Sequence, residues 1–363
     1  MLDCFFELIR VAIGQQEALS HVPSAEEWVE IYSAAKKQAV VGVAFCGIKL
    51  LPPEQTVCLP LPMKLEWLAV TAQIQSRNEL LNRRCLELQE LVERNSMKCC
   101  ILKGQGVAEL YSAPLNLYRQ SGDIDVWLDA PKDRVIDFVM GIAPTGDFDQ
   151  KHIHFQVFDD VDVEAHWIPV HRESPKFNRV LEAYFSKEKE QQHSYLAGTL
   201  HTPTVDFQLV HQLLHVYGHY VYEGVGLRQL MDLYFTQRAF VQCMPEKREE
   251  VLSIFKRLGL MKFVAGTQYV LLRVFVLDND ALLCVPDKKE GQLLWDEMVN
   301  GGNFGQYDRR NLVKNESYLH RAWRRWSRRW RMVRFDALGT ILMPYSRIRL
   351  EVWMRTVRRK YRV

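Results

Sequence analysis

The chain has 363 residues, of which 48% are apolar, and is long enough for roughly two or three domains with a substantial core. Its eight cysteines form no Cys-x-x-Cys pair and lie mostly in apolar runs, which indicates buried free thiols in a reducing compartment. The apolar run nearest to a membrane span, residues 39–47, is closed by Lys49 and Pro52. Because Asp3 and Glu7 are unlike a signal peptide, we expect a cytoplasmic protein without a transmembrane segment.

The first part of the chain, residues 1–97, is predicted to be helical. The run Ser24-Ala25-Glu26-Glu27 has the pattern of a capping box and predicts the start of one helix. A long helix is expected over residues 63–95, because apolar side chains recur there along one stripe. The stripe consists of Trp67, Val70, Ile74, Leu81, Cys85, Leu88 and Val92. We expect this region to serve helical packing.

A turn with two glycines follows the first β-prone run. Residues 98–102 predict a strand, Lys103-Gly104-Gln105-Gly106 ends it, and residues 107–111 predict the start of a helix. Backbone N–H groups and the helix dipole favour an anion at such a turn, and Gly104 lets the backbone approach a phosphate closely. The pattern therefore predicts a phosphate-binding loop at Lys103 and Gly104.

Two aspartates, Asp123 and Asp125, lie at the start of a predicted strand over residues 124–128. Residues two apart on a strand point to the same face, so both carboxylates project together while Ile124 points into a core. Two like charges this close need a cation between them, and Mg²⁺ is bound by carboxylates together with phosphate oxygens and water. By itself such a pair is also typical of a solvated turn, but the neighbouring glycine turn favours a metal site.

A third carboxylate, Glu164, lies in the second strand of a predicted hairpin. Residues 152–158 and 161–167 predict the two strands, joined by a turn at Asp159-Asp160. In the second strand Asp162, Glu164 and His166 face one way, opposite to its apolar residues. If this strand lies beside the aspartate strand, Glu164 joins the pair. Three carboxylates could then hold two metal ions on the attacking and leaving oxygens of a phosphoryl transfer.

The order of these parts resembles the nucleotidyltransferase superfamily that includes DNA polymerase β, and more closely a bacterial family of uncharacterised nucleotidyltransferases. The resemblance covers roughly residues 60–306 and departs from the superfamily at Gln105, where Gly or Ser is usual. The motifs that carry it are Leu102-Lys103-Gly104, Ala108-Glu109-Leu110-Tyr111, Arg119-x-Ser121-Gly122-Asp123-Ile124-Asp125, Glu164-Ala165-His166-Trp167, Leu227-Arg228-Gln229-Leu230-Met231-Asp232 and Gly302-Asn303-Phe304-Gly305.

This resemblance implies an α+β fold, with a small mixed-sheet nucleotidyltransferase core flanked by N- and C-terminal helical regions. The reaction would move a nucleoside monophosphate from an NTP to an unknown acceptor (a small molecule, a protein or an RNA), with Mg²⁺ or Mn²⁺ as cofactor. Catalytic and metal-binding roles would fall to Asp123, Asp125 and Glu164. Nucleotide-binding roles would fall to Lys103, Gly104, Gln105, Ser121, His215, His219, Arg228 and Asp232. One alternative is a metal-dependent glycosyltransferase, but its nucleotide-sugar fold needs more parallel strands before the aspartate pair than this chain offers. The other alternative is a non-catalytic regulatory or RNA-binding protein that retains the fold.

Three histidines stand at a spacing of four in the second helical region, which begins near Asp206. His211, His215 and His219 would share one helix face. Such a row is found in zinc sites, in ligand pockets and among core side chains bonded to their neighbours. No glutamate stands in the metalloprotease position and no fourth ligand is evident, so a nucleotide or acceptor pocket and simple packing are both preferred to zinc.

The last segment, residues 308–363, is strongly basic. It holds seventeen Lys and Arg against four Asp and Glu, a net charge of +13, which leaves −10 for the rest of the chain. Trp323, Trp326 and Trp330 are interleaved with arginines at helical spacing. We expect the tryptophans to dock on the acidic body; RNA binding comes second, and an anionic membrane surface third. The predicted regions are 1–97, 98–203 for the α/β core, 204–307 for the helical cover of the site, and 308–363.

Overall fold

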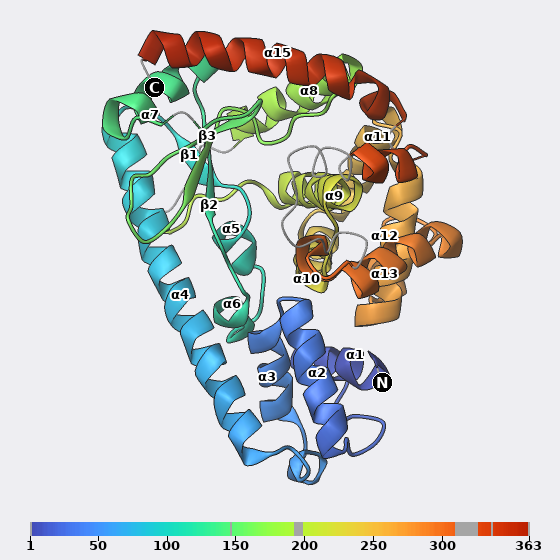
Figure 1. Ribbon diagram of the computed structural model, residues 1–363. Helices are drawn as coiled ribbons and strands as arrows, with labels where there is room; N and C mark the ends of the chain where they lie inside the picture. Colours follow the sequence, from blue (N-terminus) through green and yellow to red (C-terminus); the bar gives the residue numbers. More distant parts are fainter. Residues whose placement is uncertain (1, 146, 192–198, 309–325, 335–336, 362–363) are drawn as a thin grey trace.

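The computed structural model describes residues 2–145, 147–191, 199–308, 326–334 and 337–361 (Figure 1). In these residues a small four-stranded mixed sheet is surrounded by helices, which confirms the predicted α+β fold with helical flanks. No described helix is both long and apolar enough to cross a membrane. All eight cysteines are free thiols, although Cys58 and Cys243 are exposed rather than buried.

The N-terminal helices form the lower end of the molecule in Figure 1. Ser24 and Glu27 make the predicted capping box at the start of the second helix. The fourth helix runs from this end up to the sheet, and its apolar stripe is buried as predicted except for Val70 and Ile74, which are half-buried. The elements are α1 (Leu2–Ala12), α2 (Ala25–Lys37), α3 (Val41–Leu50), η1 (Pro53–Thr56) and α4 (Leu61–Arg94).

The sheet has the strand order β1-β2-β4-β3. The central pair β2·β4 is parallel, and the outer pairs β1·β2 and β3·β4 are antiparallel. Strand β2 has the predicted bounds. The strands are β1 (Cys99–Ile101), β2 (Ile124–Leu128), β3 (His152–His154) and β4 (Val163–His166), with α5 (Gln105–Ala108), α6 (Leu115–Tyr118) and α7 (Lys132–Ile142) between them.

Four predicted elements are shorter than expected. Strands β1 and β4 lose only residues at their ends, whereas β3 and α5 are cut short by hydrogen bonds within the chain. Strand β3 ends at His154 instead of residue 158, because the N–H of Val157 bonds to the carbonyl of Phe155 and turns the chain out of the sheet. Helix α5 has a single turn, because the N–H groups of Leu110 and Tyr111 bond three residues back, which tightens and ends the helix.

The two faces of the sheet have different partners. Ile124 and Val163 lie on the face that packs against α4 and α7, in a core that also holds Leu81 of α4 and Val135 of α7. Ile124 therefore points into a core, as predicted. On the opposite face of β2, Trp127 stacks on Phe207, the rings 5.3 Å apart. This second face belongs to the larger core, which is continuous with the N-terminal helices. Alternation along β2 thus places Asp125 on the face that looks toward the helical half of the chain.

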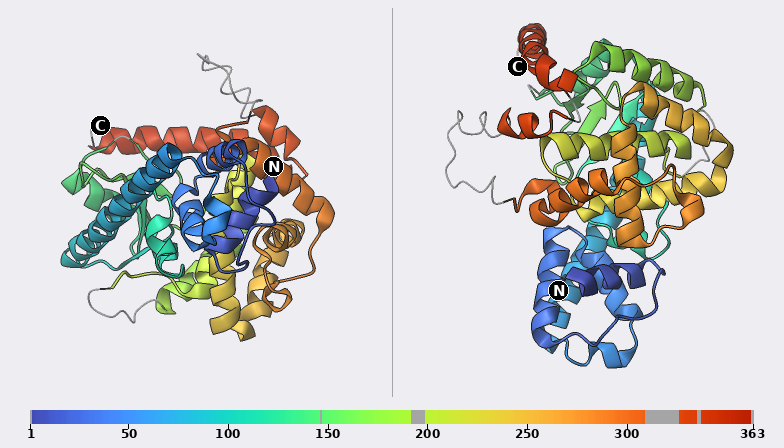
Figure 2. Two further views of the ribbon diagram at one scale, coloured as in Figure 1. Left: turned by 90° about the horizontal axis from the view of Figure 1, so that it is seen from below. Right: turned by 90° about the vertical axis from the view of Figure 1, so that its right-hand side faces the viewer.

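The helices that follow the sheet cover this second face (Figures 1 and 2). Residues 175–191, between the sheet and the second helical region, form helix α8. One hydrophobic core contains side chains of the N-terminal helices and of the helices after the sheet. The predicted region boundaries lie between helices and strands, but the regions they separate share this core. The elements are α8 (Pro175–Gln191), α9 (Val205–Tyr222), α10 (Leu227–Cys243), η2 (Pro245–Lys247), α11 (Arg248–Arg257), α12 (Met261–Phe275), η3 (Asn279–Ala281), α13 (Lys288–Gly301) and η4 (Asn303–Gly305).

The basic tail ends in helix α15 (Ala337–Tyr361), which crosses the top of Figure 1 above α7 and α8. Val357 is buried in the core between the sheet, α4 and α7, and Trp353 packs against that core. The ammonium of Lys132 on α7 lies 3.0 Å from the centre of the Trp353 ring. The tail therefore docks on the body through one face of its last helix.

The tryptophan stripe does not dock as predicted. Trp326 and Trp330 are 42% and 50% exposed, and Trp323 lies outside the described residues. The buried side chains of the described stretch 326–334 are Arg328, Arg329 and Met332. Arg328 donates to the carbonyl of Tyr220 at 2.7 Å and to Glu297 at 3.0 Å. Charge pairing with acidic and carbonyl groups therefore outweighs the burial of the indoles at this contact.

Candidate active site

The parallel pairing of β2 and β4 brings the predicted carboxylates together. Its register sets Asp125 directly beside Glu164. Because side chains of paired residues share a face, both carboxylates project toward α9. This arrangement requires a parallel pair whose members lie about 40 residues apart in the sequence.

Two cations hold Asp125 in place. The Lys103 ammonium lies 3.1 Å from its Oδ2 atom, and Nε2 of His166 lies 3.0 Å from its Oδ1 atom. The same His166 nitrogen is 3.3 Å from Oε2 of Glu164, which is also 3.1 Å from Nδ1 of His152. The carboxylate pair is therefore embedded in a cluster of basic groups.

These pairings control the protonation states in the cluster. Burial opposes ionisation of Asp125, yet Lys103 and His166 hold its pKa well below the usual range. Burial likewise opposes the charge on Lys103, but Asp125, Asp123 and Glu164 outweigh burial and raise its pKa. Burial also opposes the charge on His166, but its hydrogen bonds to the two carboxylates outweigh burial and raise its pKa. The site is thus a charged one, with anionic carboxylates and a cationic lysine.

The glycine turn after β1 lies next to Asp123. Gly104 has φ +59° and ψ −110°, a backbone conformation that side chains with a Cβ atom rarely adopt. A Cβ atom on Gly104 would lie 3.6 Å from the carbonyl oxygen of Asp123. Gly106 has a different role, since a Cβ atom there would lie 2.4 Å from the carbonyl oxygen of Ile101. Gly104 thus fixes the turn, and Gly106 lets α5 pack on β1.

Gln105 points away from these groups. Its side chain is buried and donates to Asn82 of α4 at 2.6 Å. It does not line the cavity over the carboxylates, where all the other predicted site residues are found. The substitution of Gln for the usual small residue is therefore accommodated by α4. Any contact of Gln105 with a nucleotide would have to come from its backbone.

A buried ion pair ties α10 to the loop before β2. Arg119 donates twice to the carboxylate of Asp232, through Nε and Nη2, each at 2.7 Å. Tyr111 adds a third hydrogen bond to that carboxylate at 2.7 Å. A further N–H of Arg119 bonds to the hydroxyl of Ser121 at 2.7 Å. The oxygens of Asp232 are thus committed to positioning the loop that leads to Asp123.

Arg228, one turn before Asp232 on α10, faces the cavity. It donates to the carbonyl of Gln120 at 2.6 Å and lies over the ring of Phe304, 5.1 Å from its centre. Burial and the neighbouring Arg119 lower its pKa to about 10, so it remains a cation at neutral pH. Its buried Nε atom has no hydrogen-bond partner in the part of the chain that the structure describes. A cation with an unused donor suits an anionic ligand.

The three histidines of α9 form a row of neutral imidazoles along the cavity. Burial is the main reason, and it lowers the pKa of His211 to about 3 and that of His215 well below its usual range. Nε2 of His219 lies 3.1 Å from Nε2 of His215, and its Nδ1 lies 3.0 Å from Glu223. Among the described residues, no group of three metal-ligating side chains includes any of the three histidines.

One cavity of about 830 Å³ lies over the whole arrangement. Apart from Gln105, every residue with a predicted site role lines it: Lys103, Gly104, Ser121, Asp123, Asp125, Glu164, His215, His219, Arg228 and Asp232. No role was predicted for Lys151 or Arg172, which also line the cavity, or for His166, which contacts both carboxylates. His166 could have been assigned to the site, because it is two residues from Glu164 on the same strand and so points to the same face. Lys151 and Arg172 lie in loops, where residue spacing does not indicate which way a side chain points.

The comparison with known families agrees with this geometry. A family model described as an uncharacterised nucleotidyltransferase matches residues 24–275. The chain belongs to this nucleotidyltransferase family. No curated protein and no solved structure was found to match it.

The donor set of this nucleotidyltransferase fits a hard divalent cation. Ligand atoms of Asp125, Glu164 and His166 lie within 4.8 Å of one another, and Asp123 lines the same cavity outside that group. Carboxylate oxygens are the preferred ligands of Mg²⁺ and Mn²⁺, and an imidazole nitrogen is compatible with Mn²⁺. The side chains of Lys103 and His166 lie beside the carboxylates of Asp125 and Glu164, where positive charge offsets the negative charge of the two carboxylates. That Asp123 joins the other two carboxylates on one ion stays a prediction.

Proposed function

We propose that the protein is a metal-dependent enzyme that transfers a nucleoside monophosphate from an NTP to an acceptor and releases pyrophosphate, in the manner of the polymerase β-like superfamily. The observation that carries the proposal is the parallel register of Asp125 and Glu164 under a cavity rich in cations. Family membership supplies the reaction class. The cavity volume of about 830 Å³ is in the range of nucleotide-sized ligands.

In this proposal Asp123, Asp125 and Glu164 hold Mg²⁺ or Mn²⁺. When bound, the ions supply positive charge to the phosphoryl oxygens, where negative charge develops in the transition state. Asp125 is the central ligand because it is fully buried and fixed by its strand. Glu164, at the paired position, also serves to orient or accept the proton of the attacking hydroxyl.

The triphosphate would lie against the cations of the cavity wall. Lys103 and Gly104 would contact it from the turn after β1, and Arg228 from α10 with its unused Nε donor. Ser121 would contribute a hydroxyl held in place by Arg119. Lys151, whose charge reaches Asp125 and His166, adds a further cation on the β3 side. Asp232 takes the role of a positioning residue, because its oxygens are already bonded.

The neutral imidazoles of His215 and His219 are suited to hydrogen bonding rather than to phosphate binding. Each can donate through one ring nitrogen and accept through the other. They line the cavity on the α9 side, facing the sheet. We assign them to the base, the sugar or the acceptor.

The test is transfer of label from an α-labelled NTP to components of a cell extract, with Mg²⁺ or Mn²⁺ present. Each of the four nucleotides is tried in turn with the purified chain. Label should appear on one class of acceptor, depend on the metal, and be lost in Glu164→Gln. The alternative of a non-catalytic regulator that retains the fold would be favoured by two results together. The chain would bind NTP without transferring label to any acceptor, and Glu164→Gln would leave this binding unchanged.

A further inference from the structure

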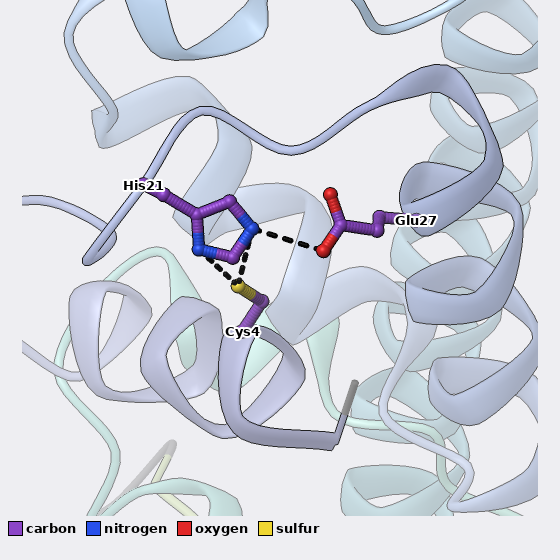
Figure 3. Close-up of side chains that lie close together, drawn as sticks. All are labelled: Cys4, His21 and Glu27. Carbon is purple, nitrogen blue, oxygen red and sulfur yellow. Dashed lines mark hydrogen bonds and ion pairs between the residues drawn. The ribbon is translucent and has the colours of Figure 1, made fainter.

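Besides the groups of metal-ligating side chains at the sheet, one further group among the described residues lies at the N-terminal end of the molecule, far from the sheet (Figures 1 and 3). Cys4 comes from α1, His21 from the loop that follows it, and Glu27 from the first turn of α2. Figure 3 shows the three side chains pointing toward one another. No residue of the proposed active site takes part.

The distances suit a tetrahedral ion. Nε2 of His21 lies 3.7 Å from Sγ of Cys4 and 2.9 Å from Oε1 of Glu27. With Zn–S and Zn–N bonds of about 2.3 Å and 2.0–2.1 Å, a tetrahedral angle puts sulfur and nitrogen about 3.6 Å apart. The nitrogen–oxygen pair, now at hydrogen-bond distance, has to open by a few tenths of an ångström, and the ligand atoms of all three residues lie within 4.8 Å of one another.

The ligands are held in position by other contacts. Oε2 of Glu27 accepts the N–H of Ser24 at 2.8 Å as part of the capping box, which leaves Oε1 for His21. The loop that carries His21 is fixed by Glu7, whose carboxylate accepts the N–H of Ser20 at 2.9 Å. Such supporting hydrogen bonds orient ligands before an ion arrives.

Chemistry separates a metal site from a catalytic thiol. Burial and the carboxylates of Glu7 and Glu27 raise the pKa of Cys4, whereas a nucleophilic cysteine has a lowered pKa. Both ring nitrogens of His21 lie at similar distances from the sulfur, 3.5 Å and 3.7 Å, which is not the single aligned bond of a nucleophile–base pair. A divalent cation would relieve the same negative surroundings.

We propose that Cys4, His21 and Glu27 bind Zn²⁺ or a similar borderline ion, with water in the fourth position. The side chains of His21 and Glu27 are 50% and 33% exposed, which gives the ion a path to the buried sulfur. Binding releases the proton of the Cys4 sulfur to solvent, while Nε2 of His21 binds through its lone pair with the ring proton on Nδ1, and no oxidation is involved. A bound ion links α1, its following loop and α2, so it stabilises the N-terminal helices.

Cobalt titration of the tag-free full chain tests this site. A sulfur ligand gives Co²⁺ a thiolate charge-transfer absorption in the near ultraviolet, which the oxygen and nitrogen ligands of the proposed active site cannot give. We expect this band in the wild type, its displacement by Zn²⁺, and its loss in Cys4→Ser and His21→Gln. Because His21 is a surface side chain, His21→Gln remains informative even if Cys4→Ser folds poorly.

Two controls separate this site from the others. Cys243→Ser removes an exposed thiol outside the cluster, and Asp125→Asn disrupts the proposed active site; both should keep the band. We also expect Zn²⁺ to raise the melting temperature of the wild type but not that of His21→Gln. A wild type without the band, or a band unchanged in His21→Gln, would overturn the proposal. Neither result would bear on nucleotidyl transfer.

Discussion

At the scale of single residues, the structure distinguishes two aspartates that look equivalent in the sequence. Asp125 is buried and bonded to Lys103 and His166, whereas Asp123 is half-buried and lies immediately before the first residue of β2. The like-charge repulsion expected between them is therefore already offset at Asp125 by two basic groups. Removing Asp125 leaves the ammonium of the half-buried Lys103 without its closest counter-ion.

This difference predicts different outcomes for Asp125→Asn and Asp123→Asn. Both should reduce nucleotidyl transfer by about 100-fold or more, because each removes a metal-directed carboxylate. Asp125→Asn should also lower the free energy of unfolding by about 3 kcal/mol, since it breaks a buried ion pair. Asp123→Asn should change stability by less than about 0.5 kcal/mol. Urea denaturation alongside the labelling assay measures both effects, and equal stability of the two variants would contradict the assignment.

At the scale of elements, the turn between β1 and α5 is the part most sensitive to backbone conformation. Gly104 has a positive φ, but a Cβ atom there would make only an ordinary contact, at 3.6 Å. Substitution at this position therefore strains the backbone without a steric clash. This makes alanine a gentler probe of the turn than a branched side chain.

We expect Gly104→Ala to cost about 1–2 kcal/mol of stability, the usual penalty for a side chain in the left-handed region. The same change should weaken binding of a fluorescent NTP analogue, because the turn no longer presents its N–H groups correctly. Gly14→Ala is the matched control, since Gly14 also has a positive φ (+75°), a Cβ atom there meets open space, and it does not line the cavity. If the folded Gly104→Ala variant binds NTP as tightly as Gly14→Ala does, the turn is not the phosphate-binding loop.

At the scale of the whole molecule, the basic tail is tied to the body by a few specific contacts. Arg328 reaches Tyr220 at the end of α9 and Glu297 on α13. Helix α15 lies over the far side of the sheet, where Val357 enters the core. The outer face of α15 leaves apolar side chains exposed, among them Ile341, Ile348 and Val352. The tail is thus part of the fold on one side and open to a partner on the other.

Docking through Arg328 predicts a clear contrast with Arg359, near the end of the tail. Arg328→Ala should lower the free energy of unfolding by about 3 kcal/mol, because the buried carboxylate of Glu297 loses its ion pair with Arg328. Arg359→Ala, at an exposed position of α15, should have little effect on stability. Both are measured by urea denaturation of the full chain. Similar stability losses in the two variants would show that tail docking does not depend on the buried arginine.

The sequence by itself determined the local parts of this protein. It predicted β2, the capping box of α2, the course of α4 and the face of Glu164, because these follow from period-2 or period-3.6 patterns in continuous segments. The glycine turn and the acidic pair were evident for the same reason. Each is a short run whose chemistry depends on neighbours in the chain.

Only the tertiary structure decided which distant groups meet. The parallel register that sets Asp125 beside Glu164 depends on strand pairing across the sheet, and no local pattern specifies it. Loop residues such as Lys151 reach the cavity without periodicity, and Gln105 is turned away by Asn82 on another helix. Arg328 rather than the tryptophans is buried in the tail, because its partners on α9 and α13 are brought together only by the fold. Helix and strand periodicity can be recognised within one segment of the sequence, but the pairing of charges from distant segments cannot.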